Sequence, residues 1–308
     1  MKKIFSICLV AVLLLVNACK KDDKISASEE FGFEERFSPK EDELPVIKEM
    51  FKTYDLWLRL NFKDAKEVTN SILMQDPGNR YGATPLAEEM KPSAIMFVDT
   101  LLHNVSTDYV RRVFPREFFF VKTYDGSYWE KNIHALGRTR LIVCWPNKVK
   151  DAQPITVPET HYYQDSVVTR MVWSSLSNML VQRMEQEIPG FEAAGMPYDN
   201  GKIMDEISKN YPGNSEEAIE IRQAELTKMA AERGYVSASG SRTYDTDLSQ
   251  WLSLLVLESF DNIKTKYLDN SPKRTEKYKV LTEYLKKEYN WDIQAAGNKY
   301  REKLNSFQ

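Results

Sequence analysis

Three polar residues on one expected helix are the first candidates for chemistry. Ser174, Ser175 and Asn178 interrupt the otherwise amphipathic run MVWSSLSNMLVQRMEQ, residues 171–186. Positions 174 and 178 are four residues apart, so on a helix they share a face. Their neutral oxygens are poor ligands for Zn²⁺, which prefers imidazole, thiolate and carboxylate. The pattern leaves two interpretations open: an ordinary helix surface, or the frame of an active site whose chemical groups have been replaced.

Other catalytic motifs find little support in the sequence. A serine nucleophile at Ser174 or Ser175 would need a Gly-x-Ser-x-Gly elbow and an oriented base, and neither is evident. No two histidines are within helical reach of each other, and the chain contains only His103, His134 and His161. His161 directly precedes the helix and is a candidate cleft residue. Asp245 and Asp247 alternate as in a calcium loop, but the remaining ligands are absent, so we expect them to cap a helix.

Composition indicates a globular protein. The chain has 308 residues, of which 42% are hydrophobic and 28% charged, with a net charge of -3. This balance is typical of folded domains. Nothing in the charge favours nucleic acid as a partner.

The amino-terminal sequence predicts export and a lipid anchor. MKKIFSICLVAVLLLVNAC has a basic start and a short apolar run before Cys19, which is the layout of a secretory signal. The residues before Cys19 resemble the lipobox of bacterial lipoproteins. That resemblance implies cleavage after residue 18 and acylation of Cys19, and several acyl chains anchor firmly. The alternative is a plain signal peptide with a chance cysteine.

A polar tether is expected to follow the lipid anchor. Lys21-Asp22-Asp23 resembles the surface-export signal of Bacteroidota lipoproteins. The stretch to residue 35 has too little apolar content to fold. Because Cys8 leaves with the signal and Cys19 carries lipid, Cys144 is the one cysteine left, and we expect it to be a buried small hydrophobe.

The remaining chain, residues 36–308, predicts an α+β fold. In the part covering residues 36–160, spacing favours a helix running into a strand over 44–62, a helix over 91–105, and strands at PREFFFVKTY and RTRLIVCW. In the part covering residues 161–308, helices dominate. Their expected ranges are about 165–188, 215–234, 245–268 and 271–290, with Ser215 and Ser271 as caps and Gly234 just past the end of its helix.

Taken in order, these features resemble a family of Bacteroidota zinc-binding metallopeptidase lipoproteins, also described as substrate-import-associated zinc metallohydrolase lipoproteins. The best local match is MAAERGYVSASGSRTYDTDLSQWLSLLVLES, residues 229–259, and YKVLTEYLKKEYNWDIQAAGNKYREKL near the end is similar too. The resemblance implies a small mixed sheet with helices in the first half and a helical, zincin-like second half.

The family's active helix carries His-Glu-x-x-His, in which two imidazoles bind zinc and the glutamate activates a water. The resemblance places the two ligand positions at Ser174 and Asn178 and the general-base position at Ser175. The later acidic run falls on residues 246–250, where Asp247 is kept and Gln250 replaces a glutamate. These five positions would form a vestigial zinc site that binds no metal and carries no catalytic residue.

The lost ligand positions predict a catalytically inactive protein, and the resemblance implies a surface-anchored lipoprotein that assists nutrient import at the outer membrane. Its expected partners are a TonB-dependent transporter and a SusD-like lipoprotein. We expect the cleft to bind a peptide or glycan without cutting it. Two alternatives stay open: an active zinc metallohydrolase with rearranged ligands, in which His161 and Asp247 would be tested first, and a purely structural partner of a transporter.

Overall fold

The structure is a computed structural model that describes residues 38–63, 67–68, 82–124, 133–145, 162–163, 166–184, 186–198, 202–238 and 243–306. Its contacts separate Met1–Glu41 from a compact unit, Asp42–Gln308. The fold described below is that of the second unit. The signal, Cys19, the tether to residue 35 and His161 lie outside the described residues.

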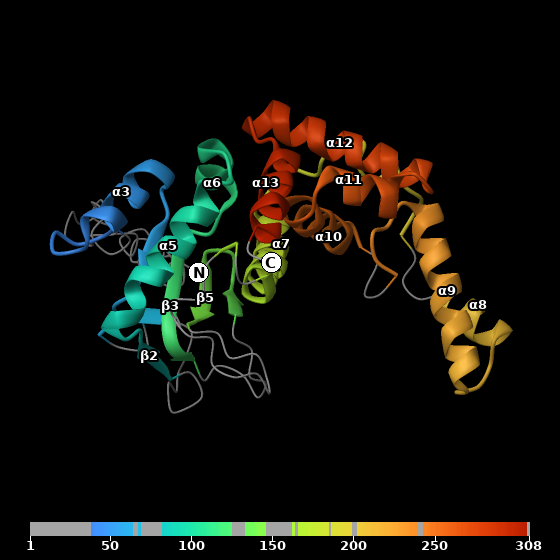
Figure 1. Ribbon diagram of the computed structural model, residues 1–308, viewed down its shortest axis with the longest axis horizontal. Helices are drawn as coiled ribbons and strands as arrows, with labels where there is room; N and C mark the ends of the chain where they lie inside the picture. Colours follow the sequence, from blue (N-terminus) through green and yellow to red (C-terminus); the bar gives the residue numbers. More distant parts are fainter. Residues whose placement is uncertain are drawn as a thin grey trace, which may run out of the picture. The chain divides into compact units, whose positions relative to one another are not determined.

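A small mixed sheet forms the first half of this unit (Figure 1). Its strands are β1 (Trp57–Arg59), β2 (Ala83–Pro85), β3 (Glu117–Tyr124), β4 (Ile133–Leu136) and β5 (Arg140–Cys144). The order is β1-β3-β5-β4, with β1, β3 and β5 parallel and β4 antiparallel to β5. β2 pairs antiparallel with the end of β3. Gly137, at φ 56°, turns the chain between β4 and β5, a backbone conformation that favours glycine.

The helices of the first half cover the sheet. They are α3 (Pro45–Tyr54), the 3-10 turn η3 (Glu88–Met90), α5 (Lys91–Leu102) and α6 (Thr107–Val113). Phe97 of α5 packs against Phe120 of β3 and Trp145, with ring centroids 6.2 and 5.1 Å away. Cys144 is buried in a second cluster with Phe119 on the other face of the sheet, as the sequence predicts.

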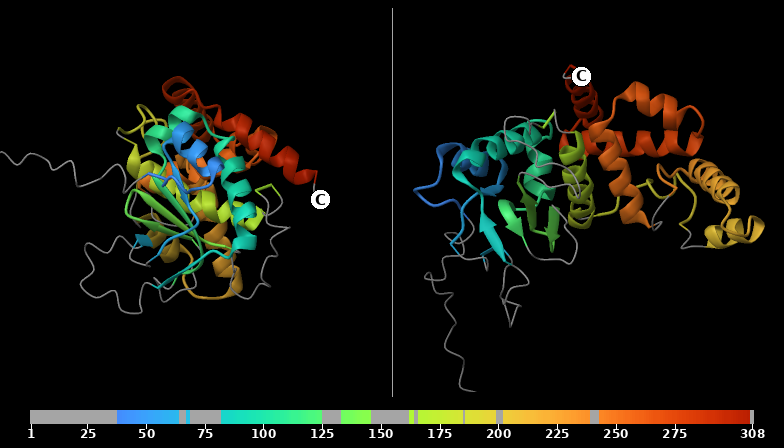
Figure 2. Two further views of the ribbon diagram at one scale, coloured as in Figure 1. Left: turned by 90° about the vertical axis from the view of Figure 1, so that its left-hand side faces the viewer. Right: turned by 60° about the horizontal axis from the view of Figure 1, so that its bottom comes forward.

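The second half is helical (Figure 2). Its elements are α7 (Ser166–Arg183), α8 (Lys202–Asn210), α9 (Glu216–Arg233), α10 (Tyr244–Leu257), α11 (Phe260–Ile263), the π-helical turn η5 (Lys264–Leu268), α12 (Pro272–Tyr289) and α13 (Ile293–Asn305). α10 packs against both α7 and α13. The expected α+β class, with a small mixed sheet and a helical second half, is confirmed. No helix in the described ranges has the length and apolar character needed to cross a membrane.

Local signals place most helix ends. The hydroxyls of Ser215 and Ser271 cap α9 and α12 as expected, and Gly234 ends α9 at φ 86°. The expected capping of α10 by Asp245 or Asp247 is wrong, because Thr243 caps the helix in a capping box with Thr246. Both aspartates lie in the first turn, where their charge suits the helix dipole.

The helix predicted over 245–268 is broken in two. Glu258 has extended backbone, and Ser259 caps the new helix α11. Two side chains of α13 bond the backbone at the break: Gln294 Nε2 donates to Glu258 O at 3.0 Å, and Phe260 N donates to Asn298 Oδ1 at 2.7 Å. Partners from a distant helix therefore compensate for the lost helical hydrogen bonds.

Candidate functional site

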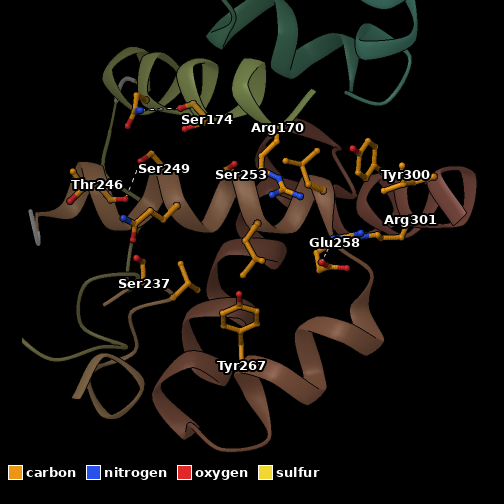
Figure 3. A pocket seen from close by; sticks show the side chains of 16 residues that line it. Arg170, Ser174, Ser237, Thr246, Ser249, Ser253, Glu258, Tyr267, Tyr300 and Arg301 are labelled. Carbon is orange, nitrogen blue, oxygen red and sulfur yellow. Dashed lines mark hydrogen bonds and ion pairs between the residues drawn. The ribbon is translucent and has the colours of Figure 1, made fainter. Parts of the chain in front are cut away.

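A cleft of about 610 Å³ lies where α7, α10 and α13 meet, with Ser237 and Tyr267 on a further side (Figure 3). Its volume falls in the range of sites that hold small ligands. Most of its lining is hydroxyl, amide and aromatic. Three helices from separate parts of the sequence build it, so the geometry of each wall follows from how that helix packs.

The α7 wall is a single stripe of polar side chains. Arg170, Ser174 and Asn178 line the cleft at intervals of four residues, which places them on one helical face. The opposite face carries the buried residues Val168, Val172, Leu176, Met179 and Leu180. Asn178 Nδ2 donates to Ser174 O at 2.9 Å. Burial of the apolar face thus points the polar stripe into the cleft.

The α10 wall is arranged in the same way. Thr246, Ser249, Gln250 and Ser253 line the cleft, and they fall on one face of the helix at spacings of three and four. The remaining face buries Leu248, Trp251, Leu252 and Leu255. Ser249 Oγ donates to Thr246 O at 3.0 Å. The two facing helices therefore present hydroxyls and amides to each other across the cleft.

The α13 wall depends on a close backbone approach. A Cβ at Gly297 would lie 2.1 Å from Leu255 O and 2.4 Å from Glu258 O, so no side chain fits there without moving α13. This approach brings Tyr300 and Arg301, one turn later, into the cleft lining.

The cleft contains one paired carboxylate and one guanidinium without an ion-pair partner in the described chain. Arg301 Nη2 bonds Glu258 Oε2 at 2.5 Å, and Asn262 Nδ2 donates to Glu258 Oε1 at 2.7 Å. Burial alone would raise the pKa of Glu258, but the hydrogen bonds from Asn262 and Arg301 outweigh it and lower the pKa. Arg170 is exposed to the cleft and makes no side-chain hydrogen bond or ion pair with another described residue.

The structure brings together three of the five positions predicted as a vestigial zinc site. Ser174, Asn178 and Gln250 line the same cleft. Ser175 is half-buried and is not part of the lining, and Asp247 is buried away from it. Whether these positions descend from a zinc site stays a prediction.

Asp247 forms a buried ion pair. Its Oδ2 accepts hydrogen bonds from Lys277 Nζ of α12 and, at 2.9 Å, from Tyr198 Oη. The two charged side chains are 2% and 0% exposed. Aromatic rings surround the ammonium, with centroids 5.0, 5.5 and 4.8 Å from Nζ: Phe191, Tyr198 and Tyr235. Burial raises the pKa of Asp247 and lowers that of Lys277, each against the attraction of its partner.

The described residues of the cleft do not fit zinc. Ser174 and Asn178 offer neutral oxygens, and Asp247 is committed to Lys277. Glu258 is the one carboxylate among the described lining residues, and both of its oxygens already accept hydrogen bonds, from three donors in all. Zinc needs several imidazole, thiolate or carboxylate ligands. Within the described ranges, no group of three or more histidines, cysteines or acids is close enough to hold a metal ion.

The two described histidines lie away from the cleft. His103 ends α5, where its Nδ1 is 2.8 Å from Asp99 O. His134 lies on β4, with its ring centroid 4.7 Å from that of Tyr124. His161 is outside the described residues, so its predicted place beside the cleft stays a prediction.

Several cleft residues were missed by sequence reasoning. They are Arg170, Ser237, Ser249, Ser253, Glu258, Tyr267, Tyr300 and Arg301. Arg170 could have been found, because it lies four residues before Ser174 on the same helix. The residues of α13 and η5 carry no such signal, since their positions follow from long-range packing.

Comparison with known proteins supports the fold. No family model matches the chain, and no curated protein matches it. A solved structure does match: a "putative zinc-binding metallo-peptidase" from Bacteroides caccae. The likeness covers 88% of this chain and 96% of that one, with a TM-score of 0.50 and 9% sequence identity. The chain therefore has a metallopeptidase-like fold, and at this identity the likeness extends to the fold alone.

Proposed function

We propose that this chain is a lipid-anchored, surface-exposed binding protein that uses a metallopeptidase-like cleft to hold a polar ligand without hydrolysing it. The observation that carries the proposal is the chemistry of the facing walls of α7 and α10. Ser174, Asn178 and Gln250 lie in the cleft where the resemblance places metal ligands. Such side chains donate and accept hydrogen bonds well, but they neither bind zinc firmly nor activate a water.

Location and partners rest on the amino-terminal sequence. The signal layout, Cys19 and the following Lys21-Asp22-Asp23 support anchoring in the outer membrane with the domain facing outward. A protein held there by a tether is well placed to pass a ligand to an importer. The proposal therefore includes a role in nutrient import, with a TonB-dependent transporter and a SusD-like lipoprotein as partners.

Zinc content and hydrolysis together test the inactive assignment. Full-length chain purified from membranes in detergent is analysed for zinc by mass spectrometry and for cleavage of a fluorogenic peptide library. The proposal predicts far less than one zinc per chain and no cleavage. About one zinc per chain, together with a cleavage activity that His161→Ala abolishes, would instead establish an active zinc hydrolase.

A second experiment tests accessory binding. Cross-linking in intact cells, followed by affinity purification of the chain, should recover an outer-membrane transporter. A Cys19→Ala variant is the control, because it should lose both the acyl mass and the cross-link. Equal cross-linking by the unacylated variant would contradict the anchored role.

A further inference from the structure

Among the described residues that line the cleft, positive charges outnumber negative ones. Glu258 and Arg301 neutralise each other at 2.5 Å. Arg170 then remains as a guanidinium without an ion-pair partner among the described residues. Figure 3 shows its side chain pointing from α7 into the space between α7 and α10, toward Ser253. A cleft in a chain of net charge -3 thus presents a local positive group, which favours an anionic ligand.

The guanidinium suits a carboxylate in particular. Its planar fork of N–H donors matches the two oxygens of a carboxylate. Walls of hydroxyl and amide groups surround this fork, including Ser174, Gln250 and Ser253. Such groups can both donate to and accept from the hydroxyls of a sugar. Tyr267 is half-buried and adds flat aromatic surface to the lining, whereas Tyr300 is only 3% exposed, and aliphatic side chains form the rest of the apolar lining.

The walls of the cleft favour a saccharide over an extended peptide. The described lining residues lie on helices, on η5, in the loop at Val236-Ser237 or, for Glu258, at the break between α10 and α11, and none of them lies on a strand. An extended peptide is commonly recognised by hydrogen bonding to the backbone of a strand edge. A ligand in this cleft meets side chains instead, and hydroxyls and amides are the largest group among them.

We infer that the cleft binds an acidic saccharide, with the carboxylate of a uronate residue on Arg170 and its hydroxyls on the polar faces of α7 and α10. This inference rests on the proposed binding function and adds the class of ligand. It assigns Arg170 as the residue that selects acidic over neutral sugars.

Calorimetric titration of the full-length chain in detergent tests the inference. The probes are the trimers of galacturonate and of mannuronate, the neutral galactotriose, and a tripeptide of glutamate. We expect a uronate trimer to bind at least about tenfold more tightly than galactotriose. Arg170→Gln should remove this preference, because a hydrogen bond between charged groups is lost. Arg170→Lys should keep part of it, since it retains the charge but not the fork.

The matched control is Lys228→Gln, which removes the same charge from an exposed position on α9 outside the cleft lining. It should leave uronate affinity unchanged, and all variants should unfold at the wild-type temperature. Equal affinity for uronate and neutral trimers, loss of affinity in Lys228→Gln, or no uronate binding would overturn the inference. Preferential, Arg170-dependent binding of the glutamate peptide would replace the saccharide by a peptide. These results concern only the class of ligand. The proposed non-hydrolytic function is tested independently, by zinc content and peptide cleavage.

Discussion

Replacing Lys277, which forms a buried ion pair, should lower the free energy of unfolding more than removing a charge from the surface. In Lys277→Met, Asp247 would keep its hydrogen bond from Tyr198 but lose its charge partner while only 2% exposed. Oδ1 of Asp247 already has no hydrogen-bond partner among the described residues. The variant therefore leaves a buried carboxylate that is barely compensated.

The size of the effect follows from the burial of both partners. Removing one member of a buried pair typically costs about 3–5 kcal/mol. Asp247→Asn should fall near the lower end, because Lys277 keeps three aromatic rings that each contribute roughly 1 kcal/mol. The double variant buries no unpaired charge, so its cost should lie below the sum of the single costs by ~2 kcal/mol or more.

Urea unfolding at pH 7, followed by tryptophan fluorescence, measures the three free energies. The control is Lys279→Met, an exposed position on the same helix, which should change stability by less than ~0.5 kcal/mol. Thermal midpoints of the single variants should fall by roughly 6 °C or more. The reasoning would be refuted if the stability losses of the two single variants added up to the loss in the double variant. A gain of stoichiometric zinc in Lys277→Met would also refute it, because Asp247 would then be a metal ligand freed from its partner.

Three further results are expected. Gly297→Ala should destabilise the protein by about 1–3 kcal/mol or more in urea unfolding and weaken ligand binding, because the added Cβ would clash with Leu255 O; wild-type stability would contradict the close approach. The pKa of Glu258 is lowered in the folded state from its usual 4.5, so its contribution is present above that pH and is lost as pH falls through the folded value. Glu258→Gln should flatten the loss of urea stability below about pH 5, and an unchanged slope would refute this assignment. Intact-mass analysis should find acyl chains on the wild-type chain and none on Cys19→Ala; an unacylated wild type would leave a plain signal peptide.

Sequence patterns predicted the elements that depend on neighbours along the chain. The apolar stripe of α7 and the serine caps of α9 and α12 are local signals, and each is found where expected. The break at Glu258 is not local, because its hydrogen-bond partners come from α13. The short helix α8 also went unpredicted, although its buried residues Ile203 and Ile207 are four apart and share one face.

The residues of the site also differ in whether local spacing or long-range packing fixes their position. Ser174 and Asn178 face a cleft because helical spacing and the burial of Leu176 and Met179 fix their direction. Asp247 was expected to cap a helix, yet its partner Lys277 lies thirty residues later on another helix. Arg301 joins the cleft through the backbone contact at Gly297. Only the folded chain reveals such pairings.

The zinc stoichiometry of the purified full-length chain tests the central claim most directly, with the joint variant Ser174→His, Ser175→Glu and Asn178→His as its comparison. The account predicts little zinc in the wild type and a clear gain in the variant, whose two imidazoles would face the cleft four residues apart. Stoichiometric zinc in the wild type would contradict the account.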